Sequence, residues 1–341
     1  MTTRRLPRER VLLDHGAGSR AAHDLITSLF ISRFANDALG ALEDAAVLDP
    51  PAGRLAFTTD SYVIDPIFFP GGNIGSLAVH GTVNDLAMRG ARPLYLSCGF
   101  IIEEGMPLSE LEEVVGAMAE AARGAGVLVV AGDTKVVPRG AADRLFINTA
   151  GIGLVPDGLD VSCRRARPGD AVLISGTIGD HGVAVLSRRE GLAFSTPVES
   201  DSAPLNGLVA GLLEAGLDVH VLRDPTRGGL ATTLNEIADS SRVGMVLFED
   251  RIPCLPAVVG ACEILGLDPL YIANEGKCVV ILPAPEAQRA FDAMRAHPYG
   301  SRAAVIGEVV ERHPGRIYMR TRIGGSRLLD MLAGEQLPRI C

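Results

Sequence analysis

Short apolar runs alternate along the chain with longer segments in which apolar residues recur at helical spacing. In segment 108–123, for example, Leu108, Leu111 and Val115 fall on one helical face. In the first half of the chain the pattern predicts strands at 55–59, 95–102, 127–131 and 145–155, and helices at 74–88 and 108–123. In the second half it predicts strands at 172–175, 219–222, 279–282 and 304–310, and helices at 206–215, 227–240 and 286–297. Strands that alternate with helices indicate an α/β (α+β) fold class in both halves.

A stretch rich in Arg, Pro and Gly at 164–170 interrupts this pattern and marks the best domain boundary. We therefore expect an N-terminal α/β domain over 1–160 and a C-terminal α/β domain over 161–333. The last residues, 334–341, carry Gly334, Pro338 and polar side chains, and they predict a flexible tail with an exposed end.

Composition narrows the class of protein. The length of 341 residues suits about two domains of roughly 150 residues each. Hydrophobic residues make up 47% of the chain, which excludes a disordered protein, and the net charge of −9 argues against a nucleic-acid-binding surface. No apolar run approaches the ~20 residues of a membrane helix, so we expect a soluble, cytoplasmic protein that binds neither nucleic acid nor membrane.

The six cysteines are scattered and form no C-x-x-C pair, which fits neither a zinc site nor a disulfide framework. Five of them are expected to be small buried side chains. The sixth, Cys341, is the last residue, and a prenylation motif would need its cysteine four residues from the end. Lipidation therefore does not explain Cys341.

Carboxylates recur where predicted strands end. Three predicted strands run directly into Asp60, Asp133 and Asp224, and the pairs Glu43-Asp44 and Asn84-Asp85 add to the set. Ligands of open α/β sheets bind beyond the carboxyl ends of the strands, so these side chains are expected to converge. Hard oxygen ligands in this number suit Mg²⁺ that holds a polyphosphate. The predicted metal ligands are Asp60, Asp85, Asp133 and Asp224.

Three Gly-rich segments are candidate phosphate sites. The first, with Gly71, Gly72 and Asn73, opens a predicted helix whose free N–H groups would face an anion. The other two, Gly132-Asp133-Thr134-Lys135 and the Asp-Pro-Thr-Arg-Gly-Gly motif at 224–229, each combine Gly, a hydroxyl and a cation. Because the chain has neither a Walker A motif nor a Rossmann G-x-G-x-x-G motif, a bound nucleotide must be held in another way.

Only two of the 32 basic residues are lysines, Lys135 and Lys277, and both lie in Gly-flanked polar motifs. An ammonium, unlike a guanidinium, can carry a proton at a tunable pKa. Glu275 lies beside Lys277 in the Asn-Glu-Gly-Lys motif, where either a catalytic role or a solvated turn is open. For His80 and His181, a functional role and a purely structural role are both open, and His181 is expected in a tight loop.

Several motifs together resemble those of the HypE family of carbamoyl dehydratases, over nearly the whole chain from about Val11 to Cys341. The motifs that carry the resemblance are 59–66, 69–75, 132–137, 273–277 and the terminal Pro-Arg-Ile-Cys of 338–341. The Asp and Gly motifs are shared with aminoimidazole ribonucleotide synthetase, thiamine-monophosphate kinase and selenide water dikinase. The Pro-Arg-Ile-Cys ending is the specific signal, because those relatives have no use for it.

The resemblance implies a two-domain aminoimidazole ribonucleotide synthetase-like fold whose N-terminal domains pair in a homodimer. It implies an enzyme in which a partner, HypF, loads a carbamoyl group onto the Cys341 thiol. ATP with Mg²⁺ then drives dehydration of this group to a thiocyanate. The cyanide passes to iron on a HypC–HypD complex, as a ligand for [NiFe]-hydrogenase.

The resemblance also implies roles for individual residues. Cys341 would be the covalent carrier, and Lys135 and Glu275 would help to deprotonate the thiocarboxamide. The residues implied or predicted to bind ATP are Asp44, Asp60, Gly71, Gly72, Asn73, Asn84, Asp85, Gly132, Asp133 and Thr134. Two departures from the family pattern, Glu43 for Asp and Ser19 for Gly, weaken the assignments near them. Two alternatives stay open, a small-molecule ATP kinase of the thiamine-phosphate or selenide type and a non-catalytic carrier.

Overall fold

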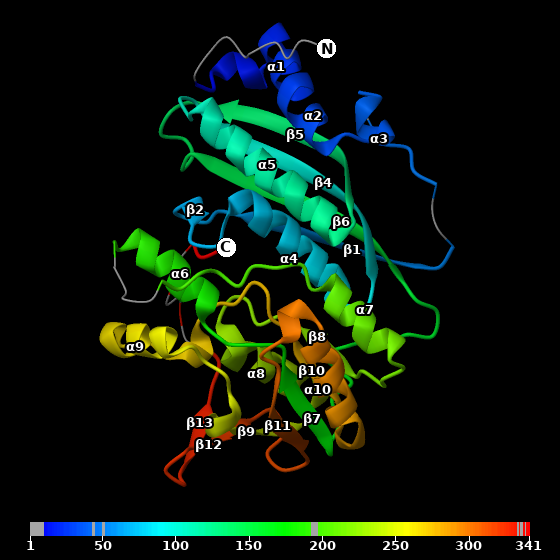
Figure 1. Ribbon diagram of the computed structural model, residues 1–341, viewed down its shortest axis with the longest axis vertical. Helices are drawn as coiled ribbons and strands as arrows, with labels where there is room; N and C mark the ends of the chain where they lie inside the picture. The colour runs from blue at the N-terminus through cyan, green and yellow to red at the C-terminus, as the bar shows by residue number, and fades with distance from the viewer. Residues whose placement is uncertain are drawn as a thin grey trace.

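The computed structural model describes residues 10–42, 45–49, 52–191, 197–332, 334, 337 and 339–341. Glu43, Asp44 and Pro338 therefore lie outside the described residues. Two α/β units are stacked along the long axis, and the C-terminus returns to the junction between them (Figure 1). This return determines where the functional site lies.

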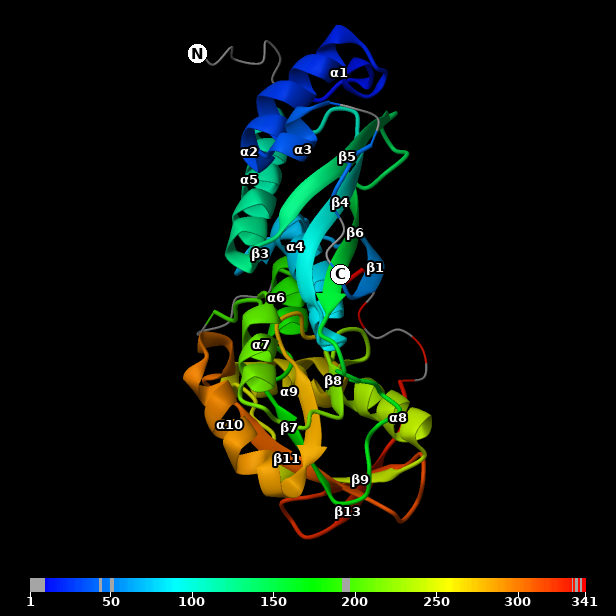
Figure 2. The ribbon, with the colours of Figure 1, turned by 90° about the vertical axis from the view of Figure 1, so that its right-hand side faces the viewer.

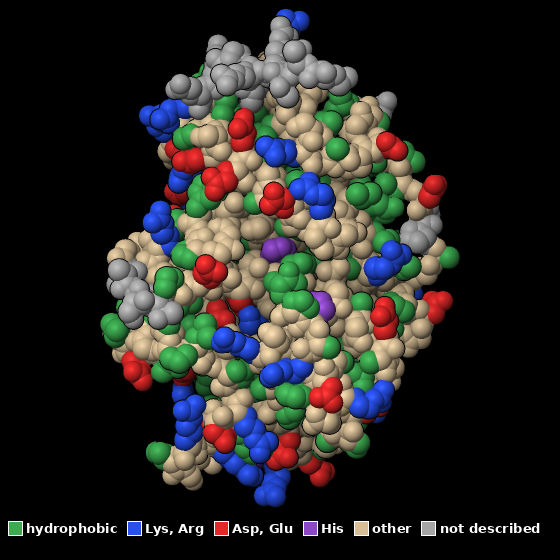
Figure 3. Space-filling view, in the orientation of Figure 1, with side chains coloured by type: hydrophobic (Ala, Val, Ile, Leu, Met, Phe, Trp, Pro, Cys, Tyr) green, Lys and Arg blue, Asp and Glu red, His purple; other side chains and the backbone are tan. Residues whose placement is uncertain are grey.

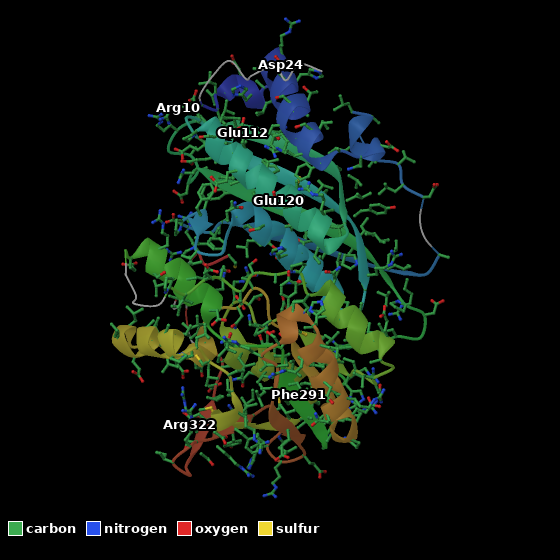
Figure 4. The ribbon with its side chains drawn as sticks, in the orientation of Figure 1. Arg10, Asp24, Glu112, Glu120, Phe291 and Arg322 are labelled. Carbon is green, nitrogen blue, oxygen red and sulfur yellow. The ribbon has the colours of Figure 1, made fainter. Side chains whose placement is uncertain are left out.

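The N-terminal unit is built on a four-stranded sheet with the order β1-β6-β4-β5. Its strands are β1 (Arg54–Tyr62), β4 (Arg92–Glu103), β5 (Leu128–Val137) and β6 (Leu145–Val155). Only β4 and β5 run parallel. Helices α4 (Ile74–Met88) and α5 (Leu108–Ala125) cover one face, and the other face is open (Figures 1 and 2). Glu112 and Glu120 lie on the outer side of α5, away from the sheet (Figure 4).

Short helical segments precede this sheet and lie across its β5 end (Figure 2). They are η1 (Leu13–Gly16), α1 (Arg20–Leu25), η2 (Ile26–Ile31), α2 (Ser32–Phe34) and α3 (Asp37–Gly40). The Ser19 side chain caps α1 by accepting from the N–H groups of Ala21 and Ala22. The serine that departs from the family pattern is therefore the N-cap of a helix. A small hairpin, β2 (Phe68–Phe69) and β3 (Gly72–Asn73), leads into α4.

The C-terminal unit contains a seven-stranded sheet with the order β13-β12-β9-β11-β7-β10-β8, in which only β9 and β12 pair in parallel. The strands are β7 (Asp170–Ile174), β8 (Val221–Arg223), β9 (Gly244–Phe248), β10 (Val279–Pro283), β11 (Ala304–Val310), β12 (Ile317–Arg320) and β13 (Ser326–Leu329). Helices α7 (Asn206–Glu214) and α10 (Ala287–Ala296) share one apolar core with this sheet, and α8 (Gly229–Ser241) shares the other. Helices α6 (Asp180–Arg189) and α9 (Pro256–Leu265) lie on the same side of the molecule (Figure 1).

The predicted α/β organisation is confirmed, and α4 and β6 have the predicted bounds. The sequence pattern did not predict the N-terminal helices, α6, α9, β9, β12 or β13. It also placed two aspartates wrongly, because Asp60 lies inside β1 and Asp133 inside β5, and only Asp224 directly follows its strand. The strands continue because Asp60 pairs with Thr149 and Asp133 with Gly99, so the backbone ladder extends through polar positions.

The distribution of charged side chains on the surface is mixed, as the composition of 32 basic and 41 acidic residues suggests. On the face in Figure 3, acidic and basic side chains are interspersed over most of the molecule. In the part of the chain that the structure describes, no helix has the length and apolar character needed to cross a membrane.

Candidate active site

A cavity of about 250 Å³ lies between the two units, and carboxylates from three different elements line it. Asp60 comes from β1, Asp85 from α4, and Asp224 follows β8. The same cavity is lined by Arg227, Glu275 and Cys341. The structure thus brings three of the four predicted metal ligands together with the predicted base and carrier.

Hydroxyl groups orient two of the carboxylates. Thr58 Oγ1 donates to Asp85 Oδ2 at 2.7 Å, and the Tyr62 hydroxyl donates to Asp60 Oδ2 at 3.2 Å. Thr58, Asp60 and Tyr62 alternate along β1, so all three face α4. Gly81 makes room for Tyr62, since a Cβ atom there would lie 2.1 Å from the Tyr62 hydroxyl oxygen.

Burial and neighbouring charge raise the pKa of two of these carboxyl groups, Asp60 and Asp224. Burial, followed by the charge of Asp85, raises the pKa of Asp60. Burial and the same neighbouring charge raise the pKa of Asp224 to about 7. Like charges that share a small cavity disfavour ionisation, and a cation bound there would relieve their repulsion. The described residues nevertheless contain no group of three or more His, Cys, Asp or Glu side chains already arranged to hold a metal ion.

Glu275 is fixed within the cavity through its backbone. Its N–H donates to Asp201 Oδ1 at 3.1 Å, and its carbonyl accepts from Asn84 Nδ2 at 3.1 Å. The residue is only 4% exposed. Burial, together with the charges of Asp224, Asp201 and Asp60, raises the pKa of Glu275 well above its ordinary value, against the opposing charge of Arg227. A carboxyl in this environment takes up a proton readily.

The end of the tail is docked in the same cavity. Ile340 and Cys341 are 5% and 9% exposed, so the expectation of an exposed end is wrong for this conformation. Arg227 Nη1 donates to Cys341 Sγ at 3.1 Å. Burial, followed by the charge of Glu275, raises the pKa of the Cys341 thiol to about 12, and Arg227 opposes this. The docked sulfur is therefore held as a thiol.

Asp133 and Lys135 lie elsewhere. They form a 3.0 Å ion pair on the edge strand β5, and both side chains are mostly exposed. Asp133 is in register with Gly99, Asn148 and Ser61, so three strand spacings of about 4.8 Å separate it from β1. Registered residues share one face of a sheet, so Asp133 points to the open face and Asp60 to the covered one. Within one chain, the structure does not bring Asp133 and Lys135 to Cys341 and Glu275.

A second cavity, of about 200 Å³, lies beside β5 under the N-terminal helices. Phe30, Phe34, Cys98 and Phe100 form its apolar lining, and 132–135 contribute the polar part. The predicted segment Gly132-Asp133-Thr134-Lys135 therefore belongs to an apolar cavity with a polar edge.

The segment before α4 is not a free anion site. Asn73 Oδ1 accepts from the N–H groups of Gly75 and Ser76 at 2.9 and 3.2 Å, and Ile74 N–H donates to the Ile67 carbonyl. The expectation of free helix N–H groups is wrong here, because the asparagine side chain caps the helix. Gly71 has a φ of 89°, and a Cβ atom there would lie 2.9 Å from the backbone of Ser200. Gly71 thus permits a close approach of the two units.

Two further predicted residues join the units. Asn84 Nδ2 donates to the carbonyls of Ala203 and Glu275, and Asn84 Oδ1 accepts from Leu205 N–H. These bonds engage both ends of the amide. His80 Nδ1 lies 2.9 Å from Ser202 Oγ, and burial lowers the pKa of His80 to about 4. Both side chains connect α4 to the segment at 202–205.

Other sequence expectations need correction. His181 lies in the first turn of α6 and is fully buried, not in a tight loop. Lys277 is buried with its Nζ 2.9 Å from Asp201 Oδ2. Arg339 Nη1 forms an ion pair with Asp143 Oδ2. The contact of Arg227 with the sulfur was not predicted, although the Asp-Pro-Thr-Arg-Gly-Gly motif at 224–229 marked a cation beside Asp224.

Comparisons with known proteins agree with this geometry. Family models described as AIR synthase related protein, N-terminal domain and C-terminal domain, match residues 42–155 and 167–320. Carbamoyl dehydratase HypE of Rhizobium leguminosarum bv. viciae is 57% identical over 333 residues, which cover 97% of this chain and 95% of that protein.

Two solved structures are similar over nearly their whole length. The crystal structure of the hydrogenase maturation protein HypE in complex with ATP has a TM-score of 0.94 and 57% identity, and the match covers 97% of this chain and 99% of that one. A chain of a HypE–HypF complex has a TM-score of 0.80 and 52% identity, with coverage of 90% and 99%. The chain therefore belongs to the HypE carbamoyl dehydratases, within the AIR synthase-related family.

Proposed function

We propose that this protein uses ATP to dehydrate a carbamoyl group carried on Cys341 to a thiocyanate. The observation that carries the proposal is the position of the Cys341 sulfur. It lies in a cavity with three carboxylates, next to Arg227 and close to a buried glutamate. A passive carrier would not need its carrier sulfur buried in such a site.

Dehydration of the carbamoyl group proceeds in two steps, phosphorylation of its oxygen and loss of phosphate. The carbamoyl oxygen attacks the γ-phosphorus of ATP and ADP leaves, which turns a poor leaving group into a good one. Loss of both N–H protons and cleavage of the C–O bond then release phosphate and leave a nitrile on the sulfur. The group has lost the elements of one water.

The chain supplies a proton acceptor at the required place. Glu275 lines the cavity that holds the sulfur, and burial raises the pKa of its carboxyl, which strengthens the carboxylate as a proton acceptor. Arg227 contacts the sulfur and can orient the carbamoyl group through hydrogen bonds. Because docking raises the pKa of the thiol, loading of Cys341 takes place when the tail is undocked, where more thiolate forms.

The carboxylate cavity suits the phosphates of ATP with Mg²⁺. Mg²⁺ in nucleotide sites is held by one or two carboxylates and by phosphate oxygens, so it needs no complete protein cage. Asp60, Asp85 and Asp224 are the residues that would hold it, and the raised pKa values of Asp60 and Asp224 fit a site designed for positive charge. Mg²⁺ there would neutralise charge on the transferred phosphoryl group. The apolar cavity beside β5 would take the adenine base.

A homodimer would complete the site. The open face of the N-terminal sheet carries an apolar row across all four strands, in which Phe57, Ile152, Tyr95 and Leu128 are in register. Phe57 is 71% exposed, which is unfavourable unless another surface covers it. A second copy packed on this face would bring its own Asp133 and Lys135, which share the face, toward the β1 strand of the first copy.

The partners follow from the same scheme. The similar structure of a HypE–HypF complex supports HypF as the protein that loads Cys341. The HypC–HypD complex, as the acceptor of cyanide, is our extension of the family resemblance. A reaction that consumes ATP also suits the expected cytoplasmic location.

Intact-mass analysis of a carbamoylated sample, before and after addition of Mg-ATP, tests the proposal. We expect the carbamoyl adduct to lose the mass of one water, with one ADP formed per conversion. The Cys341→Ala variant, which keeps the backbone bond of residue 341 to Val63, should carry no adduct. ATP turnover that does not require Cys341 would indicate a small-molecule kinase, and an adduct unchanged by Mg-ATP would indicate a passive carrier.

A further inference from the structure

The docked end of the tail, 339–341, lies beside 63–65 at the junction of the two units. Val63 N–H donates to the backbone oxygen of Cys341 at 3.1 Å, and Asp65 N–H donates to the Arg339 carbonyl at 3.3 Å. The carbonyl of Ile340, between these two, instead lies within hydrogen-bond distance of a side chain of the C-terminal unit.

His181 meets this carbonyl. Its Nε2 lies 2.8 Å from the Ile340 oxygen, and its Nδ1 lies 2.8 Å from Ser200 Oγ. Because a carbonyl only accepts, Nε2 must carry the proton, and Nδ1 of the neutral ring is left to accept from the Ser200 hydroxyl. Ser202 N–H donates to Ser200 Oγ at 3.1 Å, so the Ser200 proton is free to point at His181. The three hydrogen bonds run in one direction and fix the tautomer.

Burial favours the neutral form of this ring, and packing holds it in place. Burial lowers the pKa of His181, against the charge of Asp201 and the Ile340 carbonyl, which raise it. The ring meets Phe69 edge-on, with centroids 5.4 Å apart. Val185, one turn further along α6, packs in the same apolar core as Ile340 and Cys341. The tail therefore packs against helix α6 (Figure 1).

We propose that His181 is a positioning residue that holds the C-terminal tail in its docked place, so that the Cys341 sulfur lies beside Arg227 in the cavity that Glu275 also lines. The inference rests on the proposed function. It adds that the hydrogen bond from His181 to the Ile340 carbonyl acts as a latch, which holds the tail reversibly in the docked position. The tail must leave to be loaded and to deliver its product, so its docking must be reversible. A single neutral hydrogen bond to the last peptide group suits this need, because breaking it leaves no buried charge.

The test measures how fast iodoacetamide alkylates Cys341 in the full-length, unloaded protein without ATP. After quenching and denaturation, cleavage at Glu335 releases the peptide 336–341, whose mass reports on Cys341 alone. His181→Asn lacks a donor at the position of Nε2, and it should speed alkylation about tenfold, the factor expected for one lost hydrogen bond. His181→Gln places an amide N–H at that position and should restore protection. Arg188→Ala, an exposed change on the same helix, is the matched control.

The outcomes decide the proposal. Wild-type protection in His181→Asn, with unchanged thermal unfolding, would overturn it. Equal loss in the Gln and Asn variants would also overturn it, since ring packing and not donation would then hold the tail. If the Asn variant does not fold, Ser200→Ala decides, because it removes the hydroxyl that fixes the tautomer and leaves the imidazole ring in place. It should speed alkylation a few-fold, and an unchanged rate would contradict the latch.

A second readout separates this inference from the proposed function. In carbamoylated protein, His181→Asn should bind ATP normally but dehydrate its adduct about tenfold more slowly than wild type, with rescue by Gln. If loaded wild type itself fails to lose water, the proposed function has failed, whereas the alkylation result on unloaded protein stands by itself.

Discussion

The cavity between the units and the β5 edge of the N-terminal sheet carry residues of the same expected site in opposite environments. In the cavity, Asp60, Asp224 and Glu275 are partly or fully buried, and their pKa values are raised. On the β5 edge, Asp133 and Lys135 form an exposed ion pair about three strands away. An exposed pair of this kind contributes little stability. The difference shows that one chain brings the expected carrier and base together, whereas Asp133 and Lys135 lie on a separate, exposed surface. The proposed homodimer would join the two regions.

The largest expected effect is on the dehydration rate, when the buried glutamate of the cavity is replaced. Glu275→Gln should still bind ATP and accept the carbamoyl group, but dehydrate it about 10²–10⁴-fold more slowly, the usual contribution of a general base. Single-turnover mass analysis of loaded protein with Mg-ATP measures the rate. Glu263→Gln, which changes an exposed glutamate on α9, should behave as wild type. A normal dehydration rate in the Glu275→Gln variant would show that Glu275 is not the general base. The functional contrast between the cavity and the β5 edge would then be weaker.

Complementation tests whether the β5 edge serves the cavity of a second copy. Asp60→Asn and Asp133→Asn should each be inactive alone. Co-expressed, they should regain about a quarter of wild-type activity, because half of the dimers are mixed and each mixed dimer has one intact site. If the two residues instead served one site within a single chain, no combination would be intact and the mixture would stay inactive.

The smallest expected effect is on the melting temperature of the protein, when Asp224 in the cavity is replaced. Because the folded chain raises the pKa of Asp224 from 3.8 to about 7, its ionisation destabilises the fold as the pH rises through that window. Asp224→Asn should therefore raise the melting temperature by a few degrees above pH 7, and the gain should vanish near pH 4. Thermal unfolding between pH 4 and 8 measures it. The exposed-site variant Asp157→Asn should show no such trend, and an equal trend there would mean that burial in the cavity is not the cause.

Much of the fold followed from hydrophobic pattern alone where the pattern was strongly periodic. Helix α4 and strand β6 appear with the predicted bounds. Helix α6 was missed, because its first turn, Gly-Asp-His-Gly, has the composition of a loop. The packing of Val183 and Ala184 against α9, and of Val185 in the core that includes the tail, is a tertiary feature that the local pattern does not reveal. The Asn73 segment shows the opposite error. Its glycines and asparagine matched an anion site, but the asparagine serves as the helix cap.

By itself, the sequence determined the fold class, the family and the residue types of the site, because apolar spacing and short motifs are local properties of the chain. The tertiary structure alone decided which of those residues meet. Asp60 and Asp133 look alike in sequence, yet the alternation of side chains along a strand directs them to opposite faces of one sheet. Likewise, nothing local links His181 to Ile340, which lie 159 residues apart, and only the return of the tail to the junction of the units joins them.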